Sequence, residues 1–263
     1  MLNINQVYQG DCLEVMKGIP DKSIDMILCD LPYGTTACKW DTIIPFEPLW
    51  EQYKRIIKDN GAIVLTASQP FTSALVMSNP DMFRESIVWL KNKAGSGLQA
   101  DQKHIKVHED ILVFSLKGRY KFNPQKWLVD KKEFLTQRKT LNTLKVGNTI
   151  YSEMMKTQTK DDGTRNPISI VSTKVPHNPS ITKTYSKDID LRLHPTQKPV
   201  VLFEYLIKTY TNEGDLVLDN CAGSGTTGVA CKNLNRNYIL IEKEPEYIDI
   251  INKRLTQDTN PKE

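Results

Sequence analysis

A glycine-rich loop close to the end of the sequence limits the possible folds more than any other feature. Gly223, Gly225 and Gly228 fit the pattern G-x-G-x-x-G and stand between a predicted strand and a predicted helix. Only 35 residues follow Gly228, and they can form one further strand and one further helix. An open α/β sheet needs more strands than these, so the missing strands must come from the N-terminal part of the chain.

The first 117 residues show the alternation of strands and helices that such a sheet requires. Short apolar runs that end at turn residues predict strands, and apolar residues three and four apart predict helices. The predicted strands cover residues 6–11, 23–30, 62–68, 85–91 and 108–117, and the predicted helices cover residues 12–20, 46–61 and 70–79. We therefore expect an α/β nucleotide-binding sheet in which the order of the motifs is circularly permuted.

Acidic residues stand at the ends of several predicted strands. Asp11 and Asp30 follow two strands of the N-terminal part, and Glu242 ends the strand after the glycine loop. The carboxyl ends of the strands form the edge at which ligands bind to such sheets. Glu242 could bind ribose hydroxyls and Asp11 an adenine amino group, which suits any cofactor that contains adenosine. Taken alone, the glycine pattern also fits a nicotinamide cofactor, or a strand-to-helix turn without a ligand.

Three motifs in a defined order carry a resemblance to a known family. They are "DLPYG" (Asp30–Gly34), "HPTQKP" (His194–Pro199) and "LDNCAGSGTTG" (Leu218–Gly228), with a basic segment between the first two. This order resembles the amino-group DNA methyltransferases of the beta arrangement, which have a D-P-P-Y type catalytic motif first, a target-recognition region in the middle and the S-adenosylmethionine loop last. The resemblance covers nearly the whole chain outside the recognition region.

The resemblance implies a Rossmann-like fold of the S-adenosylmethionine-dependent methyltransferases, circularly permuted and with an inserted target-recognition region. The catalytic part would then cover residues 1–117, the target-recognition insert residues 118–192 and the cofactor-binding part residues 193–263. It implies S-adenosyl-L-methionine as cofactor and double-stranded DNA as partner. Family members are often dimers, so a homodimer is allowed. A restriction endonuclease partner is also allowed, although no sequence feature indicates one.

The family's catalytic motif places Asp30, Leu31, Pro32 and Tyr33 around the target amine. An exocyclic amine is a poor nucleophile because its lone pair is delocalised into the ring. A carboxylate that accepts a hydrogen bond from the amine favours a localised lone pair, which can attack the activated methyl group directly. Tyr33 offers a ring on which a base can stack after it has left the duplex. No covalent enzyme intermediate is needed.

The family's cofactor motifs assign further residues to S-adenosylmethionine. Asp219, Gly223 and Gly225 are assigned to its methionine and sugar portion, Glu242 to the ribose, Asp11 to the adenine, and Thr196 and Lys198 to the methionine carboxylate. The neighbouring Cys12, Cys221 and Ala222 complete the expected cofactor site. Two departures stand out: Leu31 replaces the first proline of D-P-P-Y, and Asn220–Cys221 stands where the family often has Pro-Phe. An aromatic contact with the cofactor is therefore absent.

The middle of the chain is basic. The net charge of the whole chain is +4, but residues 117–192 hold 16 Lys and Arg against 7 Asp and Glu. This segment alone carries +9, which leaves −5 for the remainder. Scattered aromatic residues accompany the positive charge. Such a segment can be a long solvated insertion, or a module in which cations neutralise phosphates and aromatic rings contact bases. Charge alone does not decide between them.

Several other classes of protein are not indicated. The five cysteines have no C-x-x-C spacing, so neither a disulfide framework nor a zinc site is predicted. His104 and His108 stand four apart, but no third metal ligand is placed by the sequence, and we expect no metal. No apolar run approaches the roughly 20 residues that a membrane span needs. We find no signal-peptide pattern at residues 1–11 and expect a cytoplasmic location.

Together these features predict a site-specific DNA methyltransferase that acts on the N6 amine of adenine. An Asp rather than a Ser at the first motif position resembles the adenine-specific members. Three alternatives stay open: a cytosine-N4 methyltransferase, a catalytically silent DNA-binding module of the same fold, and a NAD-dependent oxidoreductase.

Overall fold

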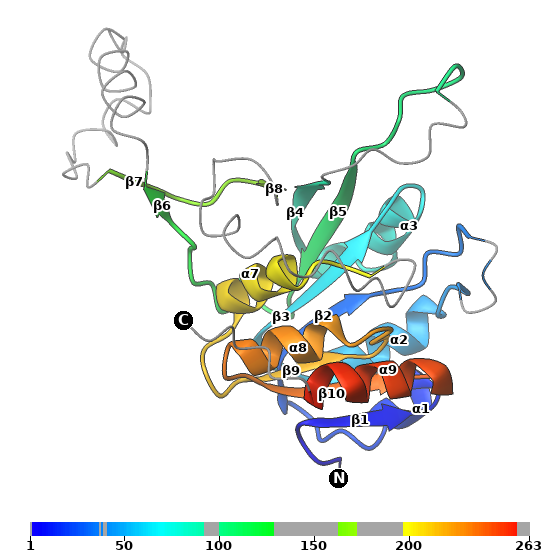
Figure 1. Cartoon of the computed structure of the whole chain (residues 1–263). Coiled ribbons are helices and arrows are strands. Elements are labelled where there is room, and N and C mark those ends of the chain that lie inside the picture. The colour runs from blue at the N-terminus through cyan, green and yellow to red at the C-terminus, as the bar shows by residue number, and fades with distance from the viewer. Residues whose placement is uncertain are drawn as a thin grey trace, which may run out of the picture.

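The computed structural model describes residues 2–36, 38, 41–91, 100–128, 163–172 and 197–256. One sheet of eight strands crosses the molecule, and helices cover both of its faces (Figure 1). Its strands are, in sheet order, β1 (Gln6–Gln9), β10 (Asn237–Glu242), β9 (Leu216–Asp219), β2 (Ile24–Asp30), β3 (Ile57–Ala67), β5 (His108–Phe114), β4 (Phe83–Leu90) and β8 (Ile170–Ser172). The helices are α1 (Cys12–Met16), α2 (Phe46–Ile56), α3 (Phe71–Ser78), the 3₁₀ turn η1 (Pro80–Met82), α7 (Val200–Tyr210), α8 (Thr226–Asn233) and α9 (Pro245–Thr256).

The strand order confirms the permuted sheet. The strands β9 and β10 come from the end of the chain, yet they lie between β1 and β2, which come from its beginning. The strands from β1 to β3 in this order are all parallel, and β5 alone runs antiparallel to its neighbours. The first residue of β5 therefore lies at the same edge as the last residues of β2, β9 and β10. Asp30, Asp219 and Glu242 all lie at this edge, which we call the carboxyl edge.

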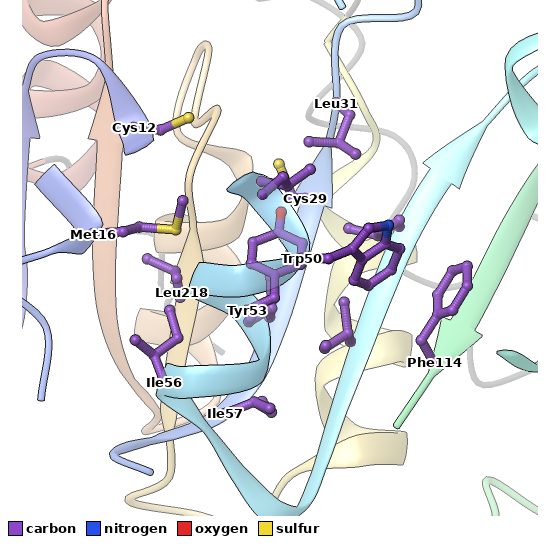
Figure 2. Packing of buried hydrophobic residues seen from close by; sticks show 14 of the residues in the cluster. Cys12, Met16, Cys29, Leu31, Trp50, Tyr53, Ile56, Ile57, Phe114 and Leu218 are labelled. Carbon is purple, nitrogen blue, oxygen red and sulfur yellow. The ribbon is translucent and has the colours of Figure 1, made fainter. Parts of the chain in front are cut away.

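Two apolar layers hold the helices against the sheet. On one face, α1, α2 and α3 pack on the sheet, and Figure 2 shows Trp50 and Tyr53 of α2 between Leu218 of β9 and Phe114 of β5. The rings of Trp50 and Phe114 lie 4.9 Å apart between centroids. On the other face, α7 and α8 bury a second cluster that includes Phe203. Each fully buried large side chain contributes about 1.5–3 kcal/mol, so the sheet is a rigid base for its edge.

The prediction of a helix over residues 46–61 is wrong at its end. Helix α2 stops at Ile56, because Ile57 has extended backbone angles and begins β3. Gly61 lies inside β3 rather than at a helix end. A Cβ atom at Gly61 would lie 2.8 Å from the carbonyl oxygen of Asp25 and 2.7 Å from Ile57 Cδ1. The glycine thus marks a close approach of two strands, a meaning that its position in a helical pattern conceals.

A small second sheet and the edge strand β8 belong to the predicted insert. Strands β6 (Trp127–Leu128) and β7 (Thr164–Arg165) pair with each other, and β8 pairs in parallel with β4. Most of residues 118–192, with Thr196, lies outside the described residues. The three-part division of the chain stays a prediction. Within the described ranges, no helix is long and apolar enough to cross a membrane.

We predict that Gly61→Ala lowers the free energy of unfolding by about 1–3 kcal/mol, because the new methyl group overpacks the contact between β2 and β3. Urea denaturation measures the change. Gly118→Ala is the matched control, since nothing lies within 4 Å of its added Cβ atom among the placed neighbours. Equal stabilities of the two variants would contradict this explanation of Gly61.

Candidate active site

Asp30 is the centre of the carboxyl edge. It ends β2, a strand whose preceding residues from Ile24 to Cys29 are all buried, and it is the first residue there to reach partial exposure. Its Oδ1 accepts hydrogen bonds from Tyr33 Oη at 2.9 Å and from the hydroxyl of Thr66. Thr66 is the residue opposite Asp30 in the pairing of β2 with β3. Asp30 Oδ2 accepts a hydrogen bond from Lys198 Nζ at 2.6 Å. Three different segments therefore orient this carboxylate.

Tyr33 is fixed at both ends of its side chain. Its ring stacks on Phe71 at the start of α3, with centroids 5.2 Å apart and planes at 26°, and Lys198 Nζ lies 5.6 Å from the ring centroid. Burial, followed by the nearby Asp30 carboxylate, raises the pKa of Tyr33 well above its usual value. The phenol is therefore neutral and can donate to Asp30. Phe71 covers one face of the ring, so a stacked base must use the other.

The other two residues of the predicted catalytic motif differ in exposure. The Leu31 side chain is 3% exposed and packs in the apolar layer under α2, so any contact of Leu31 with substrate would come from its backbone. Pro32 is half-buried between Leu31 and Tyr33. The replacement of the first proline by leucine is thus explained by core packing.

Asp41 organises the loop after the motif, and the sequence gives no sign of this role. Its Oδ1 accepts from the Gly34 amide at 2.8 Å, and its Oδ2 accepts from the amides of Thr35 and Thr36 at 2.9 and 2.7 Å. The Thr36 hydroxyl also donates to Oδ2 at 2.7 Å. Burial opposes the charge, but these hydrogen bonds outweigh it and lower the pKa of Asp41. The carboxylate thereby holds the turn directly beside Tyr33.

The acids of the glycine loop bind the loop itself. Asp219 is 3% exposed and accepts hydrogen bonds from the Cys221 amide at 3.1 Å and from the Thr227 hydroxyl. Burial raises the pKa of Asp219 to about 7 despite these hydrogen bonds. Glu242 accepts from the amides of Gly223, Lys243 and Glu244 at 2.7–2.9 Å. Burial raises the pKa of Glu242 as well.

The glycines of the loop divide into two kinds, and this division fits a bound cofactor. Gly223 has φ +52°, and no placed atom lies within 4 Å of where its Cβ would be. A Cβ at Gly225 would instead lie 2.9 Å from Ile251, and a Cβ at Gly228 would lie 2.7 Å from Leu240. Gly225 and Gly228 thus allow the close packing of α8, whereas Gly223 borders open space in which a ligand can approach the backbone.

The remaining predicted cofactor residues also gather here. Asp11 is exposed and accepts a hydrogen bond from the Leu13 amide at 2.9 Å as the N-cap of α1. The adjacent Gly10 amide donates to the Glu242 carbonyl at 3.0 Å, which places Asp11 beside Glu242. Ala222 is 7% exposed and Cys12 is 9% exposed. Thr196 lies outside the described residues.

The pair Asn220–Cys221, where the family often has Pro-Phe, turns inward. Asn220 is 2% exposed and accepts a hydrogen bond from Tyr53 Oη at 2.6 Å, which ties the loop to α2. A hydrogen bond with Cys221, followed by burial, raises the pKa of Cys12, and burial raises the pKa of Cys29 to about 12. These thiols are therefore neutral. Their protonation agrees with a reaction that needs no cysteine nucleophile.

Lys198 occupies a place that the sequence does not predict. Its ammonium lies 2.6 Å from Asp30 Oδ2 and 3.4 Å from Glu109 Oε2, between the two carboxylates. Burial alone would lower the pKa of Lys198, but the charges of Asp30 and Glu109 outweigh it and raise this pKa. Its backbone carbonyl accepts from the Thr226 hydroxyl at 3.3 Å. Lys198 thus joins the catalytic motif to the glycine loop.

Glu109 was missed because it lies near the start of its strand and not at its end. It is the second residue of β5, and the antiparallel direction of β5 brings it to the carboxyl edge. Its Oε1 forms an ion pair with Lys91. Three buried polar atoms in the described part of the chain have no hydrogen-bond partner: Trp89 Nε1, Glu109 Oε2 and Gln197 Oε1. Trp89 lies opposite Glu109 in the pairing of β4 with β5, and Gln197 directly precedes Lys198 in the sequence.

Comparison with known families decides the assignment. A family model for N6 and N4 methyltransferases, described as DNA methylase, matches residues 24–253. The chain belongs to this DNA methylase family. The matched residues include Asp30, Lys198 and the glycine loop, so both the catalytic and the cofactor motifs of the methylase lie inside the match. Its activity is S-adenosylmethionine-dependent methylation of DNA, as predicted.

Curated relatives are similar over almost the whole methylase. The DNA adenine methyltransferase YhdJ of Escherichia coli (strain K12) is 31% identical over 267 residues, which are 95% of this chain and 82% of the relative. The type II methyltransferase M.BglII of Bacillus subtilis is 29% identical over 276 residues, which are 94% of this chain and 68% of the relative.

Solved structures confirm the fold of the methylase. The crystal structure of the M1.HpyAVI–SAM complex matches with a TM-score of 0.60 at 23% identity, covering 96% of this chain and 99% of that one. The cytosine-N4-specific PvuII DNA methyltransferase matches with a TM-score of 0.64 at 17% identity, covering 100% and 89%. The Rossmann-like methyltransferase fold predicted from the sequence is confirmed.

We predict that Asp41→Asn lowers the free energy of unfolding by about 1–3 kcal/mol, because the side-chain NH2 of asparagine would face backbone N–H groups whose hydrogen bonds the carboxylate now accepts. The pKa of Asp41 is lowered by folding, so its contribution is present above the unfolded pKa and is lost as the pH falls through the folded pKa. The deficit of Asp41→Asn should therefore be full at pH 7 and shrink below about pH 4.

Chemical denaturation at pH 7 and pH 3.5 measures this deficit. Asp249→Asn, which changes an exposed acid of α9, is the matched control and should leave the free energy of unfolding unchanged at both pH values. A deficit of Asp41→Asn that is independent of pH would show that its charge is not what stabilises the loop.

Proposed function

We propose that this methylase is a site-specific enzyme that transfers the methyl group of S-adenosylmethionine to the N6 amine of adenine in double-stranded DNA. The observation that carries the proposal is the hydrogen bonding of Asp30. An ionised carboxylate has about four acceptor positions, two on each oxygen. Tyr33 and Thr66 occupy Oδ1, and Lys198 occupies one position of Oδ2. Among the described residues, one acceptor position, on Oδ2, is left for the target amine.

The free acceptor position fits the chemistry of an exocyclic amine. A hydrogen bond from the amine to Oδ2 would favour a localised lone pair on its nitrogen and orient that lone pair for attack. Tyr33 and Thr66 hold the carboxylate against rotation, and effective orientation of this kind is a large part of catalysis. A base that reaches Asp30 must first leave the duplex. The face of the Tyr33 ring that Phe71 does not cover is the surface on which it would stack.

The glycine loop is the proposed cofactor site. Bound S-adenosylmethionine supplies a methyl group that its sulfonium activates. Glu242 accepts hydrogen bonds from three backbone amides with its two oxygens, which leaves, among the described residues, one acceptor position for a ribose hydroxyl. Gly223 allows the cofactor to approach the backbone, and Asp11 lies beside Glu242 for a contact with adenine. We assign Asp219 to holding the loop in shape, since it is only 3% exposed and accepts hydrogen bonds from the Cys221 amide and the Thr227 hydroxyl of the same motif.

The proposal extends to the DNA and its recognition. Residues 118–192 are the proposed target-recognition region, supported by the net charge of +9 over residues 117–192 and by the insertion of β8 at the edge of the catalytic sheet. We place the enzyme in the cytoplasm with its DNA substrate. A homodimer and a cognate restriction endonuclease stay predictions from the family resemblance.

The test is methylation of duplex DNA by the purified protein with S-adenosylmethionine, followed by mass spectrometry of the digested nucleosides. The expected product is N6-methyladenine, as the name of the relative YhdJ suggests. N4-methylcytosine as the product would replace the proposed substrate with cytosine. The absence of methylated bases of either kind would contradict the proposed activity.

We predict that Asp30→Ala reduces the rate of methyl transfer at least 100-fold, because it removes the acceptor for the target amine. Calorimetry should show S-adenosylmethionine affinity within threefold of the wild type, which separates catalysis from cofactor binding. Asp249→Ala serves as the exposed control with unchanged rate. Methyl transfer by Asp30→Ala at the wild-type rate would remove Asp30 from the mechanism.

A further inference from the structure

Lys198 lies between two carboxylates but is bonded to only one. Its side chain is 8% exposed, and Nζ lies 2.6 Å from Asp30 Oδ2 but 3.4 Å from Glu109 Oε2. The first distance is that of a strong charge-assisted hydrogen bond, and the second is too long for one. Lys198 is therefore hydrogen-bonded to Asp30 and not to Glu109.

Among the described residues, Glu109 Oε2 has the 3.4 Å ion pair with Lys198 but no hydrogen bond. Its side chain is 11% exposed, and its Oε1 is engaged by Lys91. Its Oε2 is buried and has no hydrogen-bond partner among the placed residues. A buried carboxylate oxygen without a donor is costly, and such groups are rare in native structures. The nearest cation is Lys198, which would need to move by only about 0.6 Å to form an ordinary charge-assisted bond.

We propose that Glu109 is a positioning residue that receives the Lys198 ammonium when the target amine binds Asp30 Oδ2. The inference rests on the proposed function, because it concerns the same amine. One hydrogen bond, from Lys198 to Asp30, is broken. Two are formed: one from the amine to Asp30 and one from Lys198 to Glu109. No proton is transferred in this exchange, and all side-chain charges stay as they are.

The exchange removes an electrostatic obstacle to the reaction. The amine nitrogen gains positive charge as it attacks the methyl group. An ammonium bonded to the same carboxylate oxygen would repel that charge at short range, where the low local dielectric strengthens the interaction. Transfer of the ammonium to Glu109 increases its distance from the amine and leaves Asp30 as the nearest charge. The negative charge of Asp30 then stabilises the positive charge that develops on the amine in the transition state, a charge that is absent before the reaction.

In the described part of the chain, Lys198 Nζ forms ion pairs with these two carboxylates. Its backbone carbonyl is bound by Thr226, and Pro199 follows it as the N-cap of α7. Only the four-carbon side chain can therefore move. Lys91 forms an ion pair with the other oxygen of Glu109, Oε1, and holds that carboxylate in place. Hydrogen bonds from Tyr33 and Thr66 keep Asp30 in place, so the ammonium moves between two fixed acceptors.

The experiment compares Glu109→Gln with wild type in single-turnover methylation of duplex DNA at saturating S-adenosylmethionine. Glutamine has the shape of glutamate but cannot hold a cation, so we expect the rate to fall at least tenfold. S-adenosylmethionine affinity should stay within twofold, and the melting temperature should stay within a few degrees. Glu85→Gln is the matched control. Glu85 lies in β4, outside the site, and accepts hydrogen bonds from Tyr120 and Tyr210. The methylation rate of Glu85→Gln should therefore equal that of the wild type.

A double variant separates the proposed role from a structural one. Without Lys198, Glu109 has no ammonium to receive, so Lys198→Met and the double variant Lys198→Met, Glu109→Gln should react at the same rate within twofold. A structural role would instead make the two defects multiply and would weaken cofactor binding. If Glu109→Gln alone does not fold, the comparison of Lys198→Met with the double variant still decides.

The outcomes also separate this inference from the proposed function. Wild-type protein that forms no N6-methyladenine contradicts the proposed function, whatever the variants do. Wild-type protein that methylates adenine, together with Glu109→Gln at the wild-type rate or with multiplying defects, overturns only the role of Glu109. The role stands if Glu109→Gln is slow, binds the cofactor normally and adds nothing to Lys198→Met.

Discussion

The ion pair between Lys198 and Asp30 is the interaction on which the rest of the site depends. It joins residues 168 positions apart, one at the end of β2 and one at the entry to α7. Lys198 is buried and keeps its charge because two carboxylates raise its pKa. Its backbone is bound by Thr226 of α8, which begins directly after the glycine loop. A displacement of either part is therefore transmitted to the other through one side chain.

The sheet supplies the geometry that makes this pair possible. Strands β10 and β9 from the end of the chain lie between β1 and β2 from its beginning and run parallel to them, so their last residues meet at one edge although they are distant in sequence. The single reversed strand, β5, adds an acid from its beginning to the same edge. Glu109 thereby joins Asp30 and Lys198 without any change in the parallel part of the sheet. The apolar layers under α2 and α7 keep this edge rigid.

The sequence predicted the features that depend on local pattern and motif order. The glycine loop, the "DLPYG" motif and their permuted order led to the fold, the family and the cofactor, all of which are confirmed. Asp30 and Tyr33 do lie together at the carboxyl edge, and their catalytic roles stay predictions. The contacts of Asp41 and Glu109 could not be predicted, because each depends on backbone or side chains that only the folded chain brings within reach. Gly61 was read as a helix end because its contact with β2 is invisible in the sequence.

The same reason explains why the contact of the Lys198 ammonium with Asp30 was not predicted from the sequence. The motif "HPTQKP" indicates a residue near the cofactor, and its neighbour Thr226 supports that location. The direction of a long side chain is decided by the charges around it, and Asp30 and Glu109 become neighbours only through the sheet. Burial makes this choice strong, since an unpaired buried ammonium would be costly.

The most direct test is a crystal structure of the protein with a non-reactive analogue of S-adenosylmethionine and a DNA duplex that contains its target base. The account predicts an extruded adenine whose N6 lies within about 3.2 Å of Asp30 Oδ2. It also predicts that Lys198 Nζ lies within hydrogen-bond distance of Glu109 Oε2. An amine bound elsewhere, or Lys198 still bonded to Asp30 with the base in place, would contradict it.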